Sequence, residues 1–255
     1  MADQSLRDLE TGYYVYGVVP ALEDAGPVLT GIDDAEVVFV EHADVAAAVA
    51  EIALERPPGR RAELMAHSAV VEALSERGPV VPVQFGSVME DVDSVVHDLL
   101  ARDHDYYVDL LERLRGLHQF RLQGTYVQDQ VLAELVQERP DIADLRRRTR
   151  DLPEGMMHPA LVQLGELVSE AMDRRRDQDT DAVLDVVEPL VVATRHRRSG
   201  GVDGLLDVAL LVEDARAGEL ETQLETLAEA VHERIRLSLS GPMAPFDFVE
   251  GEQWV

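Results

Sequence analysis

The first part of the 255-residue chain predicts three strands from short runs of β-branched, aromatic and small apolar residues. The run at 13–19, closed by Pro20, is aromatic and β-branched, which is typical of a strand. Residues 36–41 follow turn-forming residues and predict a second strand. The Ala- and Val-rich stretch at 44–52 favours a third strand that pairs with the second, although alanine also favours helix.

Two helices and one short strand are predicted next along the chain. Residues 61–77 follow a Pro-Pro-Gly break and carry apolar side chains at helical spacing, so they predict a helix. The apolar run at 80–86 contains a proline and is too short for a helix, so an edge strand or a bulged strand fits it best. From 91 to 115 the apolar residues repeat every three or four positions for about six turns, which predicts one long amphipathic helix.

The second half of the chain reads in the order strand, helix, variable helices, strand, strand, helix, strand. This is the split-βαβ or ferredoxin-like order with an insertion, in which two helices cover one face of an antiparallel sheet. The expected fold class is therefore α+β. We predict an N-terminal domain at 1–115 and a modified ferredoxin-like (βαββαβ) domain at 116–255 with a helical insertion around 140–188. The segments behind this order are strands at 119–127, 190–194 and 205–212, helical patterns at 129–139, 161–172, 181–187 and 220–235, and an extended tail at 237–249.

The charge balance narrows the function classes. The chain has 23 Lys and Arg residues against 50 Asp and Glu residues, a formal net charge of −27. A surplus this large repels nucleic acids and anionic membrane surfaces, so neither is an expected partner. It reflects either adaptation to high salt or a coding bias, since Lys and Asn are both absent. No apolar run approaches the roughly 20 residues of a membrane span, and the acidic start does not resemble a signal sequence, so we expect a soluble cytoplasmic protein.

Candidate chemistry in the sequence is weak. The absence of cysteine removes disulfides, thiolate catalysis and Cys-based metal sites. Glu63 and His67 lie one helical turn apart and could form an acid–base or metal pair, but no further ligand pattern accompanies them, so a structural role is favoured. Ser87 lacks the flanking glycines of a nucleophile elbow, and the glycines at 200–204 lack the Lys of a phosphate loop. We predict no catalytic residue, no cofactor and no metal.

Two dense arginine runs interrupt the acidic chain, at 146–150 and at 174–176. Such runs are usually solvated helix faces whose ion pairs contribute little. The alternative is a docking patch for an acidic partner, because guanidinium groups bind carboxylates in bidentate fashion. On this second interpretation Arg146, Arg147 and Arg148 are candidate partner-binding residues.

Three motifs together resemble the gas vesicle protein family GvpF/GvpL. The strand at 14–19 is similar to the start of that family, and the helix carrying His67, followed by the segment 79–88, is similar to its most recognisable motif. The segment 241–249 is similar to the Gly-Pro-x-x-Pro-Tyr-x-Phe-Val ending. Gln84 stands where arginine is usual and Phe246 where tyrosine is usual. The motifs follow the family order over nearly the whole chain.

The resemblance implies a non-enzymatic accessory or minor structural protein of gas vesicle assembly, located in the cytoplasm and at the gas vesicle. It implies binding to the hydrophobic shell protein GvpA, which limits aggregation of that protein during nucleation, and binding to other accessory gas vesicle proteins. It also implies two α+β domains, the C-terminal one a modified ferredoxin-like domain with a variable insertion, in agreement with the order read above.

An apolar surface is needed to hold a hydrophobic subunit, through helix docking or strand addition. We predict that the edge at 80–88 and the helix at 91–115 frame this surface. We call it the 80–99 surface, because its predicted apolar residues lie between positions 80 and 99. Two alternatives stay open: a ferredoxin-like module that binds a small ligand or acts in regulation, and an enzyme that uses Glu63 and His67. The apolar candidates for partner binding on the 80–99 surface are Val83, Phe85, Val88, Val95 and Leu99.

Overall fold

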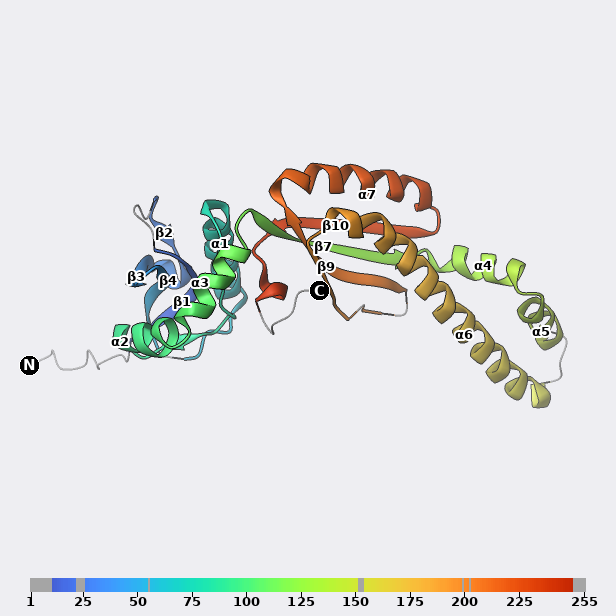
Figure 1. Ribbon diagram of the computed structural model, residues 1–255. Coiled ribbons are helices and arrows are strands. Elements are labelled where there is room, and N and C mark those ends of the chain that lie inside the picture. The colour runs from blue at the N-terminus through green and yellow to red at the C-terminus, as the bar shows by residue number, and fades with distance from the viewer. Residues whose placement is uncertain are drawn as a thin grey trace, which may run out of the picture. The chain divides into compact units, whose positions relative to one another are not determined.

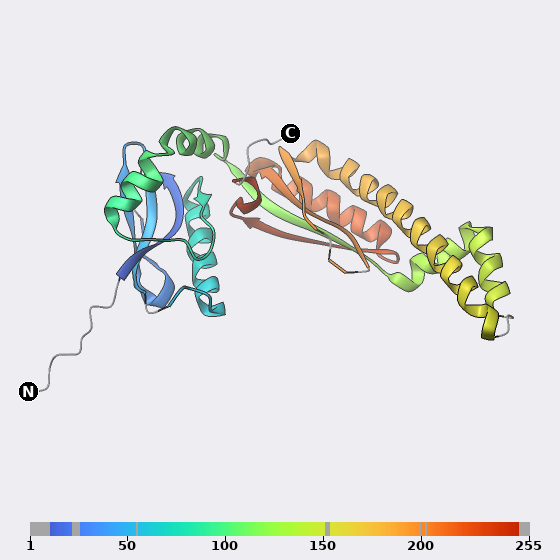
Figure 2. The ribbon, with the colours of Figure 1, turned by 90° about the horizontal axis from the view of Figure 1, so that it is seen from below.

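The computed structural model describes residues 11–249 apart from 22–25, 55, 151–153, 199 and 202, and gives only the backbone of 154–158. The fold is mixed α+β, as predicted, and the chain divides into two compact units (Figures 1 and 2). Unit 1 contains the described residues up to Gln119 together with the segment that begins at Gly241, and unit 2 contains residues 120–240.

Unit 1 is built on an antiparallel sheet with the strand order β2-β3-β4-β1-β5, and β6 pairs with another part of β1. The stretch with the helix–strand ambiguity is a strand, and all residues from Val45 to Ala50 are buried. Both faces of this strand are therefore covered, which suits small apolar side chains. The strands are β1 (Thr11–Pro20), β2 (Leu29–Thr30), β3 (Glu36–His42), β4 (Val45–Ala53), β5 (Val81–Pro82) and β6 (Val88–Met89).

Helix α1 (Arg61–Arg77) has the predicted bounds and packs on one face of this sheet. Its buried residues Val70, Val71 and Leu74 share a core with alternate residues of β4, from Ala46 to Ile52. Since side chains alternate along a strand, Val45, Ala47 and Val49 point to the other face, where the helical segment after β6 contacts β1, β3 and β4.

The single helix predicted at 91–115 is wrong in detail. The segment consists of α2 (Val92–Ser94), a π-helical stretch η2 (Val95–Ala101) and α3 (His104–Arg113). Asp103 interrupts it with a non-helical backbone, φ −117° and ψ 26°. The apolar stripe continues across this break, which is why the pattern reads as one helix. The strand predicted at 80–86 is also shorter, because only Val81 and Pro82 pair with β1 before the chain turns.

Unit 2 is built on a four-stranded sheet with the order β10-β7-β9-β8. Its strands are β7 (Leu117–Tyr126), β8 (Ala193–His196), β9 (Gly204–Glu213) and β10 (Ile235–Met243). Strands β8 and β9 form the predicted antiparallel hairpin. Helix α7 (Ala217–Val231) and the C-terminal part of the long helix α6 (Glu154–Val187) pack on the sheet. Their shared core includes Phe120, Leu210 and Leu220.

The helices that lie between β7 and β8 in the chain are α4 (Gln128–Glu138), α5 (Pro140–Arg150) and α6, where the sequence predicts helical patterns. The helical patterns at 161–172 and 181–187 belong to one helix, since the polar residues between them lie on its surface or form ion pairs. Pro140 is the first residue of α5, a position where its missing N–H costs no hydrogen bond. Figure 1 shows α4 and α5 beside the N-terminal part of α6.

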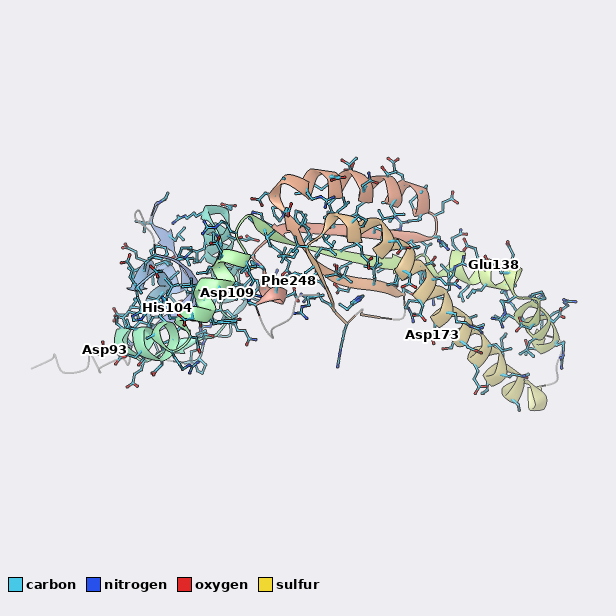
Figure 3. All side chains as sticks on the ribbon, viewed as in Figure 1. Asp93, His104, Asp109, Glu138, Asp173 and Phe248 are labelled. Carbon is cyan, nitrogen blue, oxygen red and sulfur yellow. The ribbon has the colours of Figure 1, made fainter. Side chains whose placement is uncertain are left out.

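The last described segment of the chain belongs to unit 1. Ala244 joins the core under α1. Phe248, which lies on the short helix η5 (Phe246–Phe248) and is labelled in Figure 3, is buried, with 2% of its surface exposed. Gln119 Nε2 donates to Asp247 Oδ2 at 2.6 Å, and Asp247 N donates back to Gln119 Oε1 at 3.0 Å. The predicted division at 115/116 leaves this segment with the second domain, whereas it packs with the first.

Candidate functional site

The centre of the His-led motif is an aromatic cluster inside unit 1. Helix α1 directs His67 toward β1, where its side chain is 1% exposed. The His67 ring stacks on Tyr16, with centroids 5.8 Å apart, and meets the rings of Phe85 and Phe246 at 5.7 and 6.2 Å. These contacts bring together the three motifs on which the family resemblance rests, from the start, middle and end of the chain.

Burial keeps His67 neutral, and its hydrogen bond to Tyr14 suits the neutral ring. Gly86 N donates to Tyr14 Oη at 2.9 Å, so the Tyr14 hydroxyl is free to donate to His67 Nδ1 at 3.0 Å. Burial lowers the pKa of His67 to about 4 and raises that of Tyr14 to about 12. At neutral pH the ring is therefore uncharged, and it packs as one of the aromatic groups that join α1 to β1.

Glu63 has hydrogen-bond partners different from those of His67. Its carboxylate pairs with Arg56 and accepts hydrogen bonds from Gly59 N and Arg60 N at 2.7 and 2.8 Å. The bond from Arg56, with those backbone bonds, lowers the pKa of Glu63 to about 2. These contacts satisfy free N–H groups at the start of α1. The two residues one turn apart thus have separate structural partners, as the favoured interpretation predicts.

The buried neutral histidine makes the stability of unit 1 depend on pH. The unfolded chain binds a proton at His67 near pH 6.5, whereas the folded chain does so only near pH 4. The stabilisation is therefore complete above pH 6.5 and is lost as the pH falls toward 4. At pH 5 we expect this residue to lower the free energy of unfolding by about 2 kcal/mol.

A His67→Gln variant tests this expectation, because glutamine can still accept from Tyr14 but does not titrate. Hydrogen exchange of the β1 and β4 amides between pH 7 and 5 measures unit 1 selectively, once corrected for the intrinsic exchange rate. The variant should lose much of the pH dependence, whereas replacing the exposed His232 by glutamine should leave it unchanged. Equal pH dependence in His67→Gln and the parent would contradict the assignment.

The structure distributes the predicted residues of the 80–99 surface over different degrees of burial. Val95 is fully buried and is not available to a partner. Phe85 and Val88 are half-buried and pack against the core, and Val83 and Leu99 are half-buried as well. Helical periodicity finds an apolar stripe, but it marks the side that faces the core. The more exposed apolar residues of this segment are Val92 on α2 and Tyr106 and Val108 on α3, none of which is among the partner-binding residues predicted from the sequence.

The two arginine runs have different roles in unit 2. Arg175 bridges α4 and α6, because its guanidinium binds Glu134 at 2.8 Å and Glu138 at 2.7 Å. Arg174 and Arg176 pair with acidic residues of their own helix. In α5, by contrast, Arg146, Arg147 and Arg148 are all exposed, and only Arg147 has an ion pair among the described residues, with Asp144.

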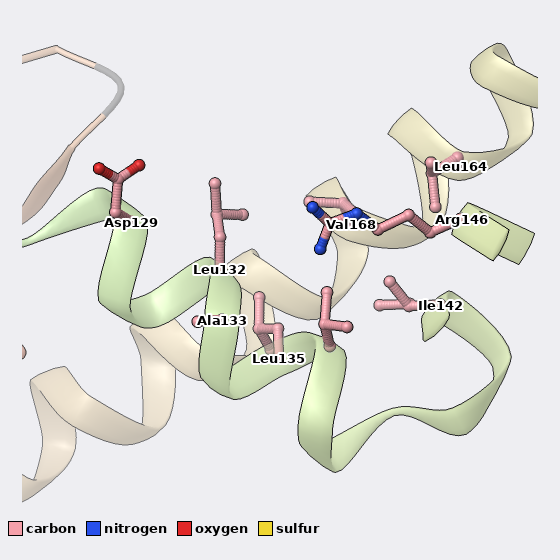
Figure 4. Close-up of a pocket in the computed structure, with 9 residues that line it drawn as sticks. Asp129, Leu132, Ala133, Leu135, Ile142, Arg146, Leu164 and Val168 are labelled. Carbon is pink, nitrogen blue, oxygen red and sulfur yellow. The ribbon is translucent and has the colours of Figure 1, made fainter. Parts of the chain in front are cut away.

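An apolar groove lies between α4, α5 and α6 in unit 2 (Figure 4). Its volume is about 420 Å³, and we call it the insertion groove. Figure 4 shows Arg146 extending over it from α5, with Asp129 on its far side. The sequence contains the apolar positions but cannot show that three helices bring them together. The lining residues are Asp129, Leu132, Ala133, Leu135, Val136, Ile142, Arg146, Leu164 and Val168.

In the described part of the chain, no group of three or more His, Asp or Glu side chains is arranged to hold a metal ion. Among the described helices, none combines the length and the apolar character needed to cross a membrane. Acidic side chains such as Asp93, Asp109, Glu138 and Asp173 are exposed on both units (Figure 3).

Known proteins similar to this chain are gas vesicle proteins. Gas vesicle protein F of a Streptomyces species is 31% identical over 245 residues, which cover 93% of this chain and 99% of that protein. Gas vesicle protein L1 of Halobacterium salinarum is 24% identical over 260 residues, covering 95% and 92%. The names of these relatives describe gas vesicle proteins and not enzymes.

Solved structures share the fold. The crystal structure of GvpF from Anabaena sp. PCC7120 has a TM-score of 0.85 at 20% identity, and covers 95% of this chain and 100% of that chain. That of GvpF from Microcystis aeruginosa has a TM-score of 0.79 at 20% identity, and covers 94% and 99%. The family profile described as "Gas vesicle synthesis protein GvpL/GvpF" matches residues 12–250. The resemblance seen in the three sequence motifs is thereby confirmed, and the chain belongs to the GvpL/GvpF family of gas vesicle synthesis proteins.

Proposed function

We propose that this chain is an accessory or minor structural protein of gas vesicle assembly that binds the hydrophobic shell protein GvpA and other accessory gas vesicle proteins. Through this binding it limits aggregation of the shell protein during nucleation, in the cytoplasm and at the growing vesicle. Membership of the GvpL/GvpF family supports a role in gas vesicle assembly. The identity of the partners is the part that this proposal adds.

The observation that carries the shell-protein contact is exposed apolar surface on an otherwise highly charged chain. Val92, Tyr106 and Val108 expose between 36% and 39% of their surface in the helical segment of unit 1. Burying such surface against an apolar subunit is favourable by about 25 cal/mol per Å². The net charge of −27 keeps the complex in solution. We therefore propose an extended 80–99 surface that adds these three residues, reaching to position 108. It keeps the predicted residues Val83 and Leu99 and leaves out Val95, which is buried.

The underlying core makes this surface rigid. Val83 N donates to Tyr16 O at 3.0 Å, and the Ser87 carbonyl accepts from Val15 N at 3.0 Å. The segment between β5 and β6 is thus tied to the central strand β1. A surface held in one conformation loses little entropy when it binds, which favours affinity.

We also propose that the predicted C-terminal domain, 116–255, is a modified ferredoxin-like domain with a helical insertion around 140–188, whose core is residues 120–240, because the segment from Gly241 packs with the N-terminal domain predicted at 1–115. The sheet order β10-β7-β9-β8 supports this proposal, because a ferredoxin-like sheet places its fourth strand beside its first and its third beside its second. The element order β7, α6, β8, β9, α7, β10, with α4 and α5 inserted, agrees with it.

Co-expression with the shell protein tests the proposed function. Val108→Asp and Leu99→Asp place a charge on the extended 80–99 surface, and each should weaken shell-protein binding roughly tenfold, or about 1.4 kcal/mol. Soluble shell protein and vesicle yield should both fall. The matched control is Val192→Asp, at a valine of unit 2 that is 48% exposed.

The fold of each variant is checked by thermal unfolding before the assay. If the two unit 1 variants keep their melting temperature and still support the parental amount of soluble shell protein, the surface is assigned wrongly. If Val192→Asp lowers the yield as much as they do, the effect is one of charge and not of this surface.

A further inference from the structure

The insertion groove combines an apolar floor with an exposed arginine, Arg146, that has no ion pair among the described residues. Leu132, Val136, Leu164 and Val168 come from two helices and line it without being fully buried. On α6, Leu161 and Val162 are 48% and 49% exposed, one to two turns before Val168. The apolar surface therefore continues along α6 beyond the groove itself.

Three of the four arginines of α5 have no ion pair with a described residue, whereas Arg147 pairs with Asp144 and several arginines elsewhere in unit 2 pair with carboxylates. Arg139 pairs with Asp141, and Arg174 pairs with Glu170. Arg146, Arg148 and Arg150 are exposed and have no ion pair within the described part of the chain. Acidic residues outnumber basic ones by 50 to 23, so partners within the chain are plentiful in principle. The exposed arginines of α5 therefore form a positively charged patch on a chain whose net charge is strongly negative.

We propose that the insertion groove binds an amphipathic α-helix of a partner protein, one whose apolar stripe is bordered by Glu or Asp. Apolar residues at i, i+3, i+4 and i+7 enter the groove, and carboxylates at the border of the stripe pair with Arg146 and with its neighbour one turn on, Arg150. This inference rests on the proposed role as a binder of other gas vesicle proteins, and it specifies the chemistry of one such partner.

A helix suits the groove better than other occupants. The groove walls are helices whose backbone groups are already hydrogen-bonded, so no free strand edge is available for an extended peptide. A helix satisfies its own backbone and brings only side chains into an apolar floor. A purely anionic ligand would leave the lining of Leu132, Leu164 and Val168 in water. Charge complementarity at α5 then selects an acidic helix over a basic one.

Direct binding of a labelled peptide to the full chain tests the proposal. The probe is a synthetic helix of roughly 18 residues with leucines at i, i+3, i+4 and i+7 and glutamates beside them. A second peptide carries lysines in place of the glutamates, and a third has the first composition in scrambled order. Fluorescence anisotropy should show binding of the acidic amphipathic helix only, and the affinity should fall as salt is raised.

Variants locate the site. Arg146→Glu should weaken binding of the acidic peptide at least about tenfold, and Leu132→Asp should do the same through the apolar floor. Arg174→Glu makes the same charge change on an exposed arginine of α6 outside the groove, and it should leave the affinity within about twofold. Circular dichroism confirms that each variant is folded, and Arg146→Glu is the least disruptive because its side chain is exposed.

Several results would overturn the proposal. Equal binding of the lysine and glutamate peptides, or unchanged affinity in Arg146→Glu, contradicts charge selection at α5. Binding of no peptide, together with self-association that Arg146→Glu abolishes, would assign the groove to a second copy of the chain. Failure here is distinct from failure of the shell-protein assay, because that assay changes residues of unit 1 and this one changes residues of unit 2.

Discussion

Replacing Phe248 by alanine is expected to lower the free energy of unfolding of unit 1 by about 3 to 5 kcal/mol. The side chain is 2% exposed and belongs to the segment that packs with unit 1 although it follows all of unit 2 in the sequence. Removing the ring leaves a cavity in unit 1. Other contacts still hold the segment in place: Ala244 in the core, the Gln119–Asp247 hydrogen bonds, and the hydrogen bond that Tyr106 Oη donates to the Val249 carbonyl.

Phe246→Ala is the matched control for this prediction. Phe246 lies two residues earlier in the same short helix, but it is 38% exposed and touches the His67 ring from outside. We expect Phe246→Ala to lower the free energy of unfolding of unit 1 by no more than about 1 kcal/mol. Hydrogen exchange of β1 and β4 amides measures both variants. Equal effects of the two changes would show that the segment contributes only its backbone to unit 1.

Replacing Arg175 by methionine is expected to lower the free energy of unfolding of unit 2 by about 3 kcal/mol. Its side chain is 16% exposed, and Asp179, whose Oδ2 lies 3.4 Å from Arg175 Nε, is 10% exposed. Asp179 also accepts a hydrogen bond from Tyr126 Oη at 2.8 Å and pairs with Arg234 at 3.1 Å. Without Arg175, partly buried carboxylates of α4 and α6 face each other with less positive charge, so α4 should separate from α6.

Arg174→Met is the neighbouring control, since Arg174 and its partner Glu170 are both well exposed. It should change stability by no more than about 0.5 kcal/mol. Adding Glu134→Gln to Arg175→Met should recover part of the loss, because it removes one of the unpaired charges. Denaturant unfolding followed by circular dichroism measures all three. A cost for Arg175→Met no larger than that of Arg174→Met would show that this network contributes little.

Elements with local signals at both ends could be predicted from the sequence. Helix α1 begins after Pro57-Pro58-Gly59 and ends before Gly78, and its predicted bounds agree with the structure. Strand β4 was ambiguous by composition, and burial on both faces decides in favour of the strand. The single helix predicted at 91–115 is wrong because no local signal in the sequence indicates the break at Asp103. The apolar residues keep their helical spacing on both sides of that break.

Features that depend on distant partners could not be predicted. The two arginine runs look alike in the sequence, yet Arg175 binds carboxylates of α4, while Arg146 has no ion pair in the part of the chain that the structure describes. The aromatic cluster draws Tyr16, His67 and Phe246 from three parts of the chain. Its motifs were visible and pointed to the family, but their contact with one another was not. The apolar stripe predicts Val95 as a partner-binding residue, but in the structure Val95 lies on the side of the segment that faces the core.

The return of the last segment to unit 1 sets an order of events during synthesis. Gln119 and Phe248 belong to the same unit, yet roughly 130 residues, most of them unit 2, are made between them. The ribosome adds about 5 to 20 residues per second, so the last segment is synthesised on the order of 10 seconds after the first part of unit 1. Only then are the residues present that cover His67 and complete the core of unit 1. Unit 2 can therefore be completed while unit 1 is still open. Any contact that protects the nascent chain is needed most at the aromatic cluster, in the interval before Ala244 and Phe248 arrive.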